Sequence, residues 1–143
     1  MAIVIKTVHV DDLPELIAFW SGMDGLGLNE SDEPRKLEQF LMRNPDLSRA
    51  AWDADQLVGA VLCGHDGRRG TLHHLAVAVA YRRHGLGDQL VDSCLSALRV
   101  EGIDKCNIFL FASNEQGEQF WRACGWQPRD DLRVFQKRLS ELD

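Results

Sequence analysis

A loop with two arginines, a histidine and two glycines lies between two apolar stretches in the middle of the chain. Its residues are Arg82, Arg83, His84, Gly85, Leu86 and Gly87, and Asp88 follows them. Such a loop, opening into a helix, brings unpaired backbone N–H groups and the positive end of the helix dipole together. Glycine lets a phosphate approach the backbone, and arginine adds side-chain donors. The spacing therefore predicts an anion site, and we expect it to cradle a pyrophosphate.

Two common phosphate-binding motifs do not fit this loop. A dinucleotide-binding motif needs a third glycine, where this chain has Leu90, and it follows the first strand of its domain. A P-loop needs a Gly-Lys-Ser/Thr sequence, which does not occur here. An ordinary turn between a strand and a helix is the remaining alternative. Asp88 would compete with a phosphate for the field of the helix, so we expect its side chain to point outward.

The composition is that of one soluble globular domain, which we expect to span residues 1–143. The chain is 45% hydrophobic and 27% charged, and its net charge of −6 disfavours nucleic-acid binding. It shows no basic leader, and no apolar run approaches the roughly 20 residues of a membrane span, so we expect a cytoplasmic protein without membrane contact. The cysteines lack metal-ligand spacing, which predicts free thiols and no metal site; they are Cys63, Cys94, Cys106 and Cys124.

Hydrophobic periodicity divides the chain into strands and helices in the order βααβββαβαβ. Strands are predicted at residues 2–8, 50–52, 57–63, 71–79, 105–112 and 132–137. Helices are predicted from Asp11 or Asp12 to about Met23, from Ser31 or Asp32 onward, from the glycine loop to about Glu101, and over residues 114–124. Residues 22–33 form a loop with acidic side chains, which would favour a cationic substrate or simply face solvent.

The glycine loop and its surroundings resemble a known family. Arg82-x-x-Gly85-x-Gly87 is similar to the (Gln/Arg)-x-x-Gly-x-(Gly/Ala) signature of the GCN5-related N-acetyltransferases (GNAT), which bind the pyrophosphate of acetyl-coenzyme A (acetyl-CoA) there. Val79 stands where much of the family has Pro. A second block, residues 114–126, resembles the family's Asn-x-x-Ala-x-x-Leu/Phe-Tyr-x-x-x-Gly-Phe pattern. The resemblance covers nearly the whole chain.

The resemblance implies an α/β (α+β) fold with a mixed, mostly antiparallel central sheet flanked by helices. It also implies acetyl-CoA as co-substrate, no metal, and direct attack of an amine on the thioester without a covalent intermediate. Backbone groups of Leu75, Ala76 and Val77 would hold the pantetheine and the thioester oxygen, with Asn114 and Phe120 nearby. An N–H group aimed at the developing oxyanion contributes about 3 kcal/mol. The alternative for the strand residues is a purely structural role in the core.

Two catalytic side chains are predicted beside these binding residues. A histidine can accept the proton of an attacking amine, and strand alternation puts His73 and His74 on opposite faces, so that only one faces the cleft. We expect His73 to be that residue, with a structural histidine as the alternative. Trp121 takes the place of the family's Tyr, which commonly protonates the departing thiolate. An indole N–H can donate a hydrogen bond to that thiolate but cannot release its proton.

Three questions stay open at the level of sequence. A non-catalytic domain that binds acyl-CoA is the alternative function, because Trp121 replaces the family's acid. The acceptor is expected to be a small-molecule or peptide amine, and the acyl group could be longer than acetyl. A homodimer is expected from the resemblance alone.

Overall fold

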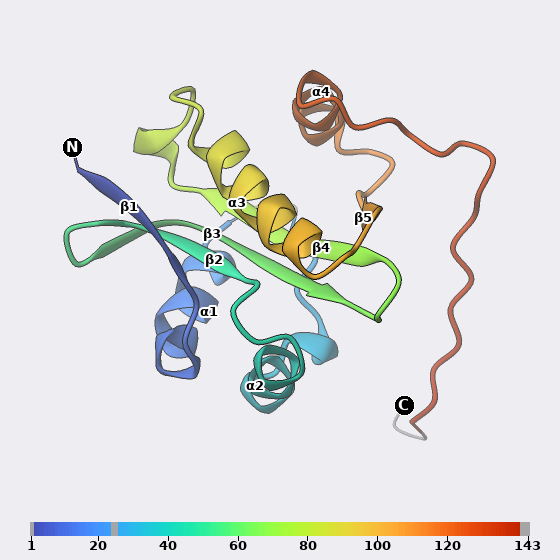
Figure 1. Ribbon diagram of the computed structural model, residues 1–143, viewed down its shortest axis with the longest axis horizontal. Coiled ribbons are helices and arrows are strands. Elements are labelled where there is room, and N and C mark those ends of the chain that lie inside the picture. Colours follow the sequence, from blue (N-terminus) through green and yellow to red (C-terminus); the bar gives the residue numbers. More distant parts are fainter. Residues whose placement is uncertain (1, 24–25, 141–143) are drawn as a thin grey trace. The chain divides into compact units, whose positions relative to one another are not determined.

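The computed structural model describes residues 2–23 and 26–140 of the chain, which divide into two compact units, one up to Phe111 and one from Ala112 onward. The first unit holds a five-stranded sheet and three helices (Figure 1). Its strands are β1 (Ile3–Thr7), β2 (Arg49–Asp53), β3 (Gln56–His65), β4 (Gly70–Val77) and β5 (Cys106–Ile108). Its helices are α1 (Leu13–Ser21), α2 (Pro34–Arg43) and α3 (Leu86–Val100), with short 3-10 turns η1 (Val10–Asp12), η2 (Glu30–Asp32) and η3 (Val79–Tyr81).

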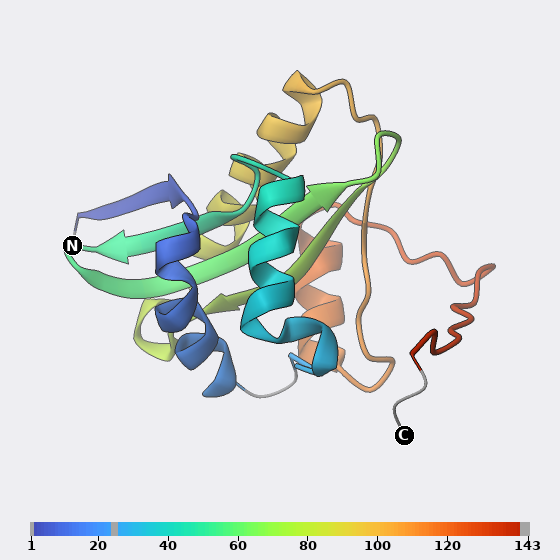
Figure 2. The ribbon, with the colours of Figure 1, turned by 90° about the horizontal axis from the view of Figure 1, so that it is seen from below.

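The strands follow the order of the chain, β1-β2-β3-β4-β5. The first three pairs are antiparallel, and β4 pairs with β5 in parallel because α3 carries the chain back between them. Figures 1 and 2 show α3 on one face of this sheet and α1 with α2 on the other. With both faces covered, β3 is buried over nearly its whole length. The mixed, mostly antiparallel sheet confirms the predicted fold class.

Periodic apolar residues place the helices on the sheet. Leu13, Leu16 and Trp20 lie on one side of α1 and are buried, as the sequence predicts, and they share a core with residues of α2 and the strands. On the opposite face of the sheet, α3 buries residues spaced three or four apart, namely Leu86, Leu90, Val91, Cys94 and Leu98. In the described residues, no helix is long and apolar enough to cross a membrane.

The second unit holds one helix, α4 (Glu115–Ala123), which begins where the sequence predicts. The side chain of Asn114 caps it, because Asn114 Oδ1 accepts a hydrogen bond from the N–H of Gly117 at 2.8 Å. Gly125 follows the helix in a left-handed conformation, with φ of +91°.

The predicted strand at residues 132–137 is wrong. The described chain is irregular there, and its apolar side chains are exposed, Phe135 at 90%. Alternation of apolar and polar residues predicts a strand only where a partner supplies ladder hydrogen bonds and a surface to cover, and this segment pairs with no strand of the described residues. The last element of the predicted order βααβββαβαβ is therefore not formed in this structure.

Several element boundaries also differ from the prediction, whereas the predicted start of α1 is confirmed. The strand predicted over residues 105–112 is only β5, and β4 stops at Val77, where the chain turns into η3. The N-cap residue of α2 is Glu33, not Ser31 or Asp32, both of which lie in η2. Asp12 is the N-cap residue of α1, but its carboxylate accepts a hydrogen bond from the N–H of His9 instead of capping that helix.

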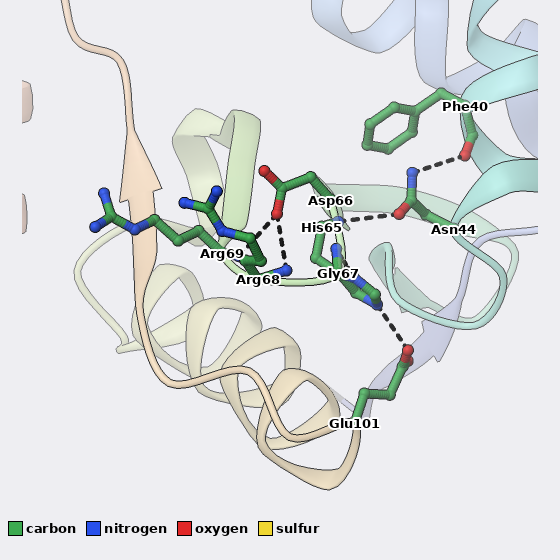
Figure 3. A network of polar contacts seen from close by, with 8 residues as sticks. All are labelled: Phe40, Asn44, His65, Asp66, Gly67, Arg68, Arg69 and Glu101. Atoms are coloured by element: carbon green, nitrogen blue, oxygen red, sulfur yellow. Dashed lines mark hydrogen bonds and ion pairs between the residues drawn. The ribbon is translucent and has the colours of Figure 1, made fainter.

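A polar network joins α2, β3 and α3 at one end of the sheet (Figure 3). The buried Asn44 accepts a hydrogen bond from the N–H of His65 at 3.0 Å and donates one to the carbonyl oxygen of Phe40 at 3.3 Å. His65 Nδ1 accepts from the N–H of Gly67, and so Nε2 is the nitrogen that donates to Glu101, 2.8 Å away. The network fixes the β3–β4 turn against both helix layers.

Replacing Asn44 by alanine should lower the free energy of unfolding by about 1 to 3 kcal/mol, because the backbone N–H of His65 loses its acceptor in a buried place. Urea denaturation of both proteins measures the change. The matched control is Met42→Ala on the same helix, since that side chain is 69% exposed and should change stability little. Equal effects of the two substitutions would show that the network does not stabilise the fold.

Candidate active site

The strand β4 is interrupted by a bulge in front of the glycine loop. On β3, Ala60 and Leu62 are separated by one residue, whereas their partners on β4, Ala76 and His73, are separated by two. His74 takes up the extra length in a left-handed conformation with φ of +57°. A bulge re-aims the side chains next to it, and a non-glycine residue held at positive φ costs on the order of 1 to 3 kcal/mol. Such strained positions gather at functional sites.

The bulge places both histidines on the side of the sheet that α1 and α2 cover. The His73 ring lies edge-on to Phe40 of α2 with centroids 5.9 Å apart, and the His74 ring lies 5.5 Å from Trp20 of α1. The two imidazoles are 6.3 Å apart. The prediction that alternation sends them to opposite faces is therefore wrong, because the left-handed residue breaks the two-residue period of the strand.

His74 is paired with a carboxylate that sequence reasoning did not assign to it. Its Nε2 lies 2.7 Å from Oδ1 of Asp32, and the two side chains are only 12% and 13% exposed. The other carboxylate oxygen, Oδ2, accepts the backbone N–H of Asn29 at 3.0 Å. Asp32 precedes His74 by 42 residues, and no local spacing signal connects them. The sequence predicts Asp32 only as a helix cap or a member of an acidic loop.

The surroundings of His73 are less polar than those of His74. Burial lowers its pKa from 6.5, the positive charge of His74 lowers it further, and the carboxylate of Asp32 acts in the opposite direction. Its ring packs against Phe40. His73 therefore stays neutral at pH values where a free histidine is partly charged.

The glycine loop leaves the N-terminus of α3 uncovered by protein atoms. Gly85 is the N-cap residue of α3 at φ of +79°, and it offers no side chain to the first N–H groups of the helix. A Cβ atom built on Gly85 would meet no protein atom within 4 Å, so open space lies in front of the helix N-terminus. Arg83, itself at φ of +66°, and His84 are exposed beside it. Asp88 is also exposed, in agreement with an outward side chain.

Two side chains fix the loop to the sheet. Nε of Arg82 donates a hydrogen bond to the carbonyl oxygen of Val77 at 2.8 Å, so this guanidinium folds back onto the end of β4. The hydroxyl of Tyr81 donates to Oδ2 of Asp53 at 2.6 Å, which raises the pKa of Tyr81. The loop is therefore held before any ligand arrives, and Arg82 orders the backbone as well as adding positive charge.

The backbone of β4 beyond the bulge is continuous with this loop. Ala76 and Val77 pair with Ala60 and Gly59 of β3, and Leu75 belongs to the bulge itself. The structure thus brings His73, His74, Leu75–Val77 and the residues of the glycine loop together in the first unit.

The remaining predicted site residues belong to the second unit. Asn114 caps α4, and the rings of Phe120, Trp121 and Trp126 form a row with centroids 5.1 and 4.8 Å apart in edge-on contacts. Trp121 is the middle ring of that row. This packing is a structural role, which we considered as the alternative to a catalytic one.

The cysteines do not have the setting of nucleophiles. Hydrogen bonding to Cys94 and burial raise the pKa of the Cys63 thiol far above its usual range, and burial raises that of Cys106 to about 12. A thiol with a raised pKa supplies little thiolate at neutral pH. Cys63 and Cys94 are buried, and the described residues contain no group of three or more His, Cys, Asp or Glu placed to hold a metal ion.

The model of the acetyltransferase (GNAT) family matches residues 14–126. An acetyltransferase of Sodalis glossinidius (strain morsitans) is 28% identical over 137 residues, which cover 96% of each chain. The PaiA N-acetyltransferase of Thermoplasma acidophilum in complex with coenzyme A has a TM-score of 0.74 at 19% identity, with 91% of this chain and 92% of that chain covered. An aminoglycoside acetyltransferase from an uncultured soil metagenomic sample, in complex with sisomicin, has a TM-score of 0.71 at 16% identity, with 96% and 97% covered.

The lowered pKa of His73 predicts a contribution to the pH dependence of stability. Between that pKa and 6.5 the unfolded chain binds more protons at this residue than the folded chain, so the free energy of unfolding falls as the pH falls through this window. Above about pH 6.5 the contribution is absent. His73→Gln removes it, and the stability of the wild type relative to this variant should therefore be greater at about pH 8 than at about pH 5 in urea denaturation. A difference that does not change with pH would contradict the prediction.

Proposed function

The chain belongs to the acetyltransferase (GNAT) family, and on this basis we propose where it binds acetyl-CoA and how it transfers the acetyl group. It is an acetyl-CoA-dependent N-acetyltransferase, with acetyl-CoA as co-substrate. The observation that carries the binding proposal is the open N-terminus of α3 at Gly85, which directly follows the bulged strand.

The pyrophosphate of acetyl-CoA binds at the start of α3. The backbone N–H groups of Leu86, Gly87 and Asp88, in the first turn of the helix, have no acceptor within the helix and supply hydrogen-bond donors. Arg82, Arg83 and His84 add positive charge around them. The open space in front of Gly85 fits this ligand, since a phosphate needs close approach to the backbone. The pantetheine arm follows Leu75, Ala76 and Val77 along β4, and the family resemblance also assigns Asn114 and Phe120 to this arm.

The acetyl group moves to the amine in one displacement. The amine attacks the thioester carbonyl carbon while a backbone N–H at the β4 bulge holds the developing oxyanion. A histidine of the His73–His74 pair accepts the proton; the sequence favours His73, whose neutral state supports that role. The indole N–H of Trp121 donates a hydrogen bond to the departing thiolate, which is a fair leaving group because its thiol is about as acidic as a free cysteine.

The acceptor is a small-molecule amine that is cationic before it reacts. Acidic residues of the loop before α2, Asp32 and Glu33 among them, support a positively charged substrate. The similarity in fold to an aminoglycoside acetyltransferase in complex with sisomicin is consistent with such an amine. The composition and charge of the chain support a cytoplasmic enzyme of one domain, residues 1–143, that does not bind nucleic acid. We propose a homodimer on the family resemblance alone.

Calorimetric titration with acetyl-CoA tests the cradle. The wild type should bind acetyl-CoA, and Gly85→Val should lose that binding at least tenfold, because the new side chain fills the open space where the phosphate approaches. Gly102→Val is the matched control: Gly102 also has positive φ, +84°, and open space, but it lies beyond the other end of the same helix, about 25 Å away.

Both variants carry a similar conformational penalty of roughly 1 to 2 kcal/mol, so their stabilities should fall together. Only Gly85→Val should affect the ligand. Normal binding by Gly85→Val, or equal loss in both variants, would show that the loop is only a turn.

Replacing Trp121 by tyrosine tests its place opposite the leaving group. Tyrosine restores a hydroxyl that can give up its proton, so Trp121→Tyr should keep or raise the rate of thiol release from acetyl-CoA in the presence of amines. Trp121→Phe keeps the ring and removes the N–H, and it should lower the rate without weakening acetyl-CoA binding. Equal rates for the tyrosine and phenylalanine variants would assign Trp121 to packing alone.

A further inference from the structure

We propose that His74, oriented by Asp32, accepts the proton of the attacking amine, with Asp32 as a positioning residue. This inference rests on the acetyl-transfer function given above, and it selects between the two histidines of β4. It adds to the site a carboxylate, Asp32, from a distant segment of the chain.

The carboxylate of Asp32 is fixed from two sides. Its Oδ2 accepts the N–H of Asn29 at 3.0 Å, while Asn29 Oδ1 accepts the N–H of Ser31 at 2.8 Å, so the turn η2 is closed by reciprocal hydrogen bonds. Its Oδ1 faces His74 at 2.7 Å, with both side chains nearly buried. An ordered acceptor of this kind holds an imidazole in one orientation.

The pairing also decides which ring nitrogen can take a proton. An ionised carboxylate only accepts hydrogen bonds, so Nε2 of the neutral His74 carries the hydrogen and Nδ1 carries the lone pair. Nδ1 has no hydrogen-bond partner among the described residues, nor is it one of their buried unpaired polar atoms, since Trp20 Nε1 alone is in that state. Among the described residues, Nδ1 is therefore the ring nitrogen that remains for the proton of a reacting group. Asp32 would orient His74, and His74 would take the proton of the substrate, as in other sites where a carboxylate orients the catalytic base.

The position of His74 in the backbone supports a catalytic role. It is the left-handed residue of the bulge, and Leu75, whose backbone is proposed to contact the thioester, is its direct neighbour. The Trp20 ring packs 5.5 Å from the imidazole and limits its rotation. His73, in contrast, packs on Phe40 and makes no ion pair with a carboxylate of the described residues. Of the two histidines, only His74 has both an orienting partner and a free ring nitrogen.

The proposed step balances as follows. The bound ammonium gives its first proton to Nδ1 of His74, and the resulting imidazolium, which the carboxylate of Asp32 stabilises, releases that proton to solvent. The neutral amine nitrogen then forms a C–N bond to the carbonyl carbon, the C–S bond breaks, and the electron pair leaves with sulfur. The second proton of the amine passes to Nδ1 of His74 and on to solvent, from which the coenzyme A thiolate takes up one proton. The products are the acetylated amine and coenzyme A, with no oxidant or reductant. The titratable groups that face His74 among the described residues are Asp32 and His73.

Kinetics of thiol release from acetyl-CoA test the proposal. The acceptor is whichever of n-butylamine, spermidine, kanamycin and a lysine-containing peptide reacts fastest with the wild type. His74→Gln should lower kcat about 100-fold or more, and Asp32→Asn at least tenfold, because the asparagine keeps the shape but not the charge. The difference in kcat between the wild type and these variants should become smaller as the pH rises towards the pKa of the amine. At such pH values the acceptor loses its first proton to solvent and does not need His74 for this step. Acetyl-CoA affinity, measured by calorimetry, should stay within about threefold of the wild type.

A second histidine–carboxylate pair in the same unit gives the matched control. His65 Nε2 lies 2.8 Å from Glu101 at the far end of β3, so His65→Gln removes a similar pair and should leave kcat unchanged. His73→Gln is the competing arm. If it lowers kcat about 100-fold while His74→Gln does not, the proposal is overturned in favour of His73.

Nitrogen NMR of protein labelled with ¹⁵N-histidine tests the pair without any acceptor. At high pH, Nε2 of His74 should carry the hydrogen and Nδ1 should be unprotonated, and Asp32→Asn should increase exchange between the two tautomers. A neutral His74 protonated at Nδ1 would overturn the proposal even if acetyl-CoA binds normally. Loss of acetyl-CoA binding in the wild type would instead count against the cofactor site, so the two failures are distinguishable.

Discussion

The bulge in β4 is the constraint on which the rest of the site depends. One extra residue on this strand forces His74 into a left-handed conformation, at a cost on the order of 1 to 3 kcal/mol. The fold offsets that cost locally. The hydrogen bond to a charged partner, Asp32, contributes about 1.5 to 3 kcal/mol in a nearly buried place, and Trp20 packs against the ring. The strained residue and its partners therefore stabilise one another.

The same bulge lies between the proposed co-substrate site and the proposed acceptor site. On its C-terminal side β4 returns to regular pairing with β3 and then ends at Val77, where Arg82 folds back onto the strand and η3 leads into α3. The proposed site of the anionic co-substrate is the N-terminus of α3. Asp32 contacts His74 on the side of the sheet that α1 and α2 cover, where its negative charge would favour a cationic acceptor. The strand β4 lies between the proposed site of the anionic co-substrate and that of the cationic acceptor. It also carries the groups proposed to act in acetyl transfer.

The sequence predicts the parts of this arrangement that depend on local patterns. The glycine at the start of α3, the apolar spacing of that helix and the turn at residues 53–55 each depend on residues a few positions apart, and the structure has them where the patterns place them. The left-handed state of His74 has no such signal, because histidine carries no glycine-like mark of positive φ. Asp32 reaches His74 across 42 residues, a contact that only the packing of α1 and α2 on the sheet creates. The strand prediction for residues 132–137 is wrong for the opposite reason. The local alternation of apolar and polar residues is typical of a strand, but in the described residues no neighbouring strand pairs with this segment.

The two histidines show how a single backbone residue can decide a functional assignment. With regular alternation, His73 and His74 would face different layers and only one would meet the substrate side. The bulge turns both towards α1 and α2, and the choice between them then depends on what each ring touches. Phe40 gives His73 an apolar neighbour, which keeps it neutral but leaves its orientation unassisted by any charge. Asp32 gives His74 a fixed tautomer and a means of stabilising the positive charge it would acquire, and for this reason the strained residue is the better proton acceptor.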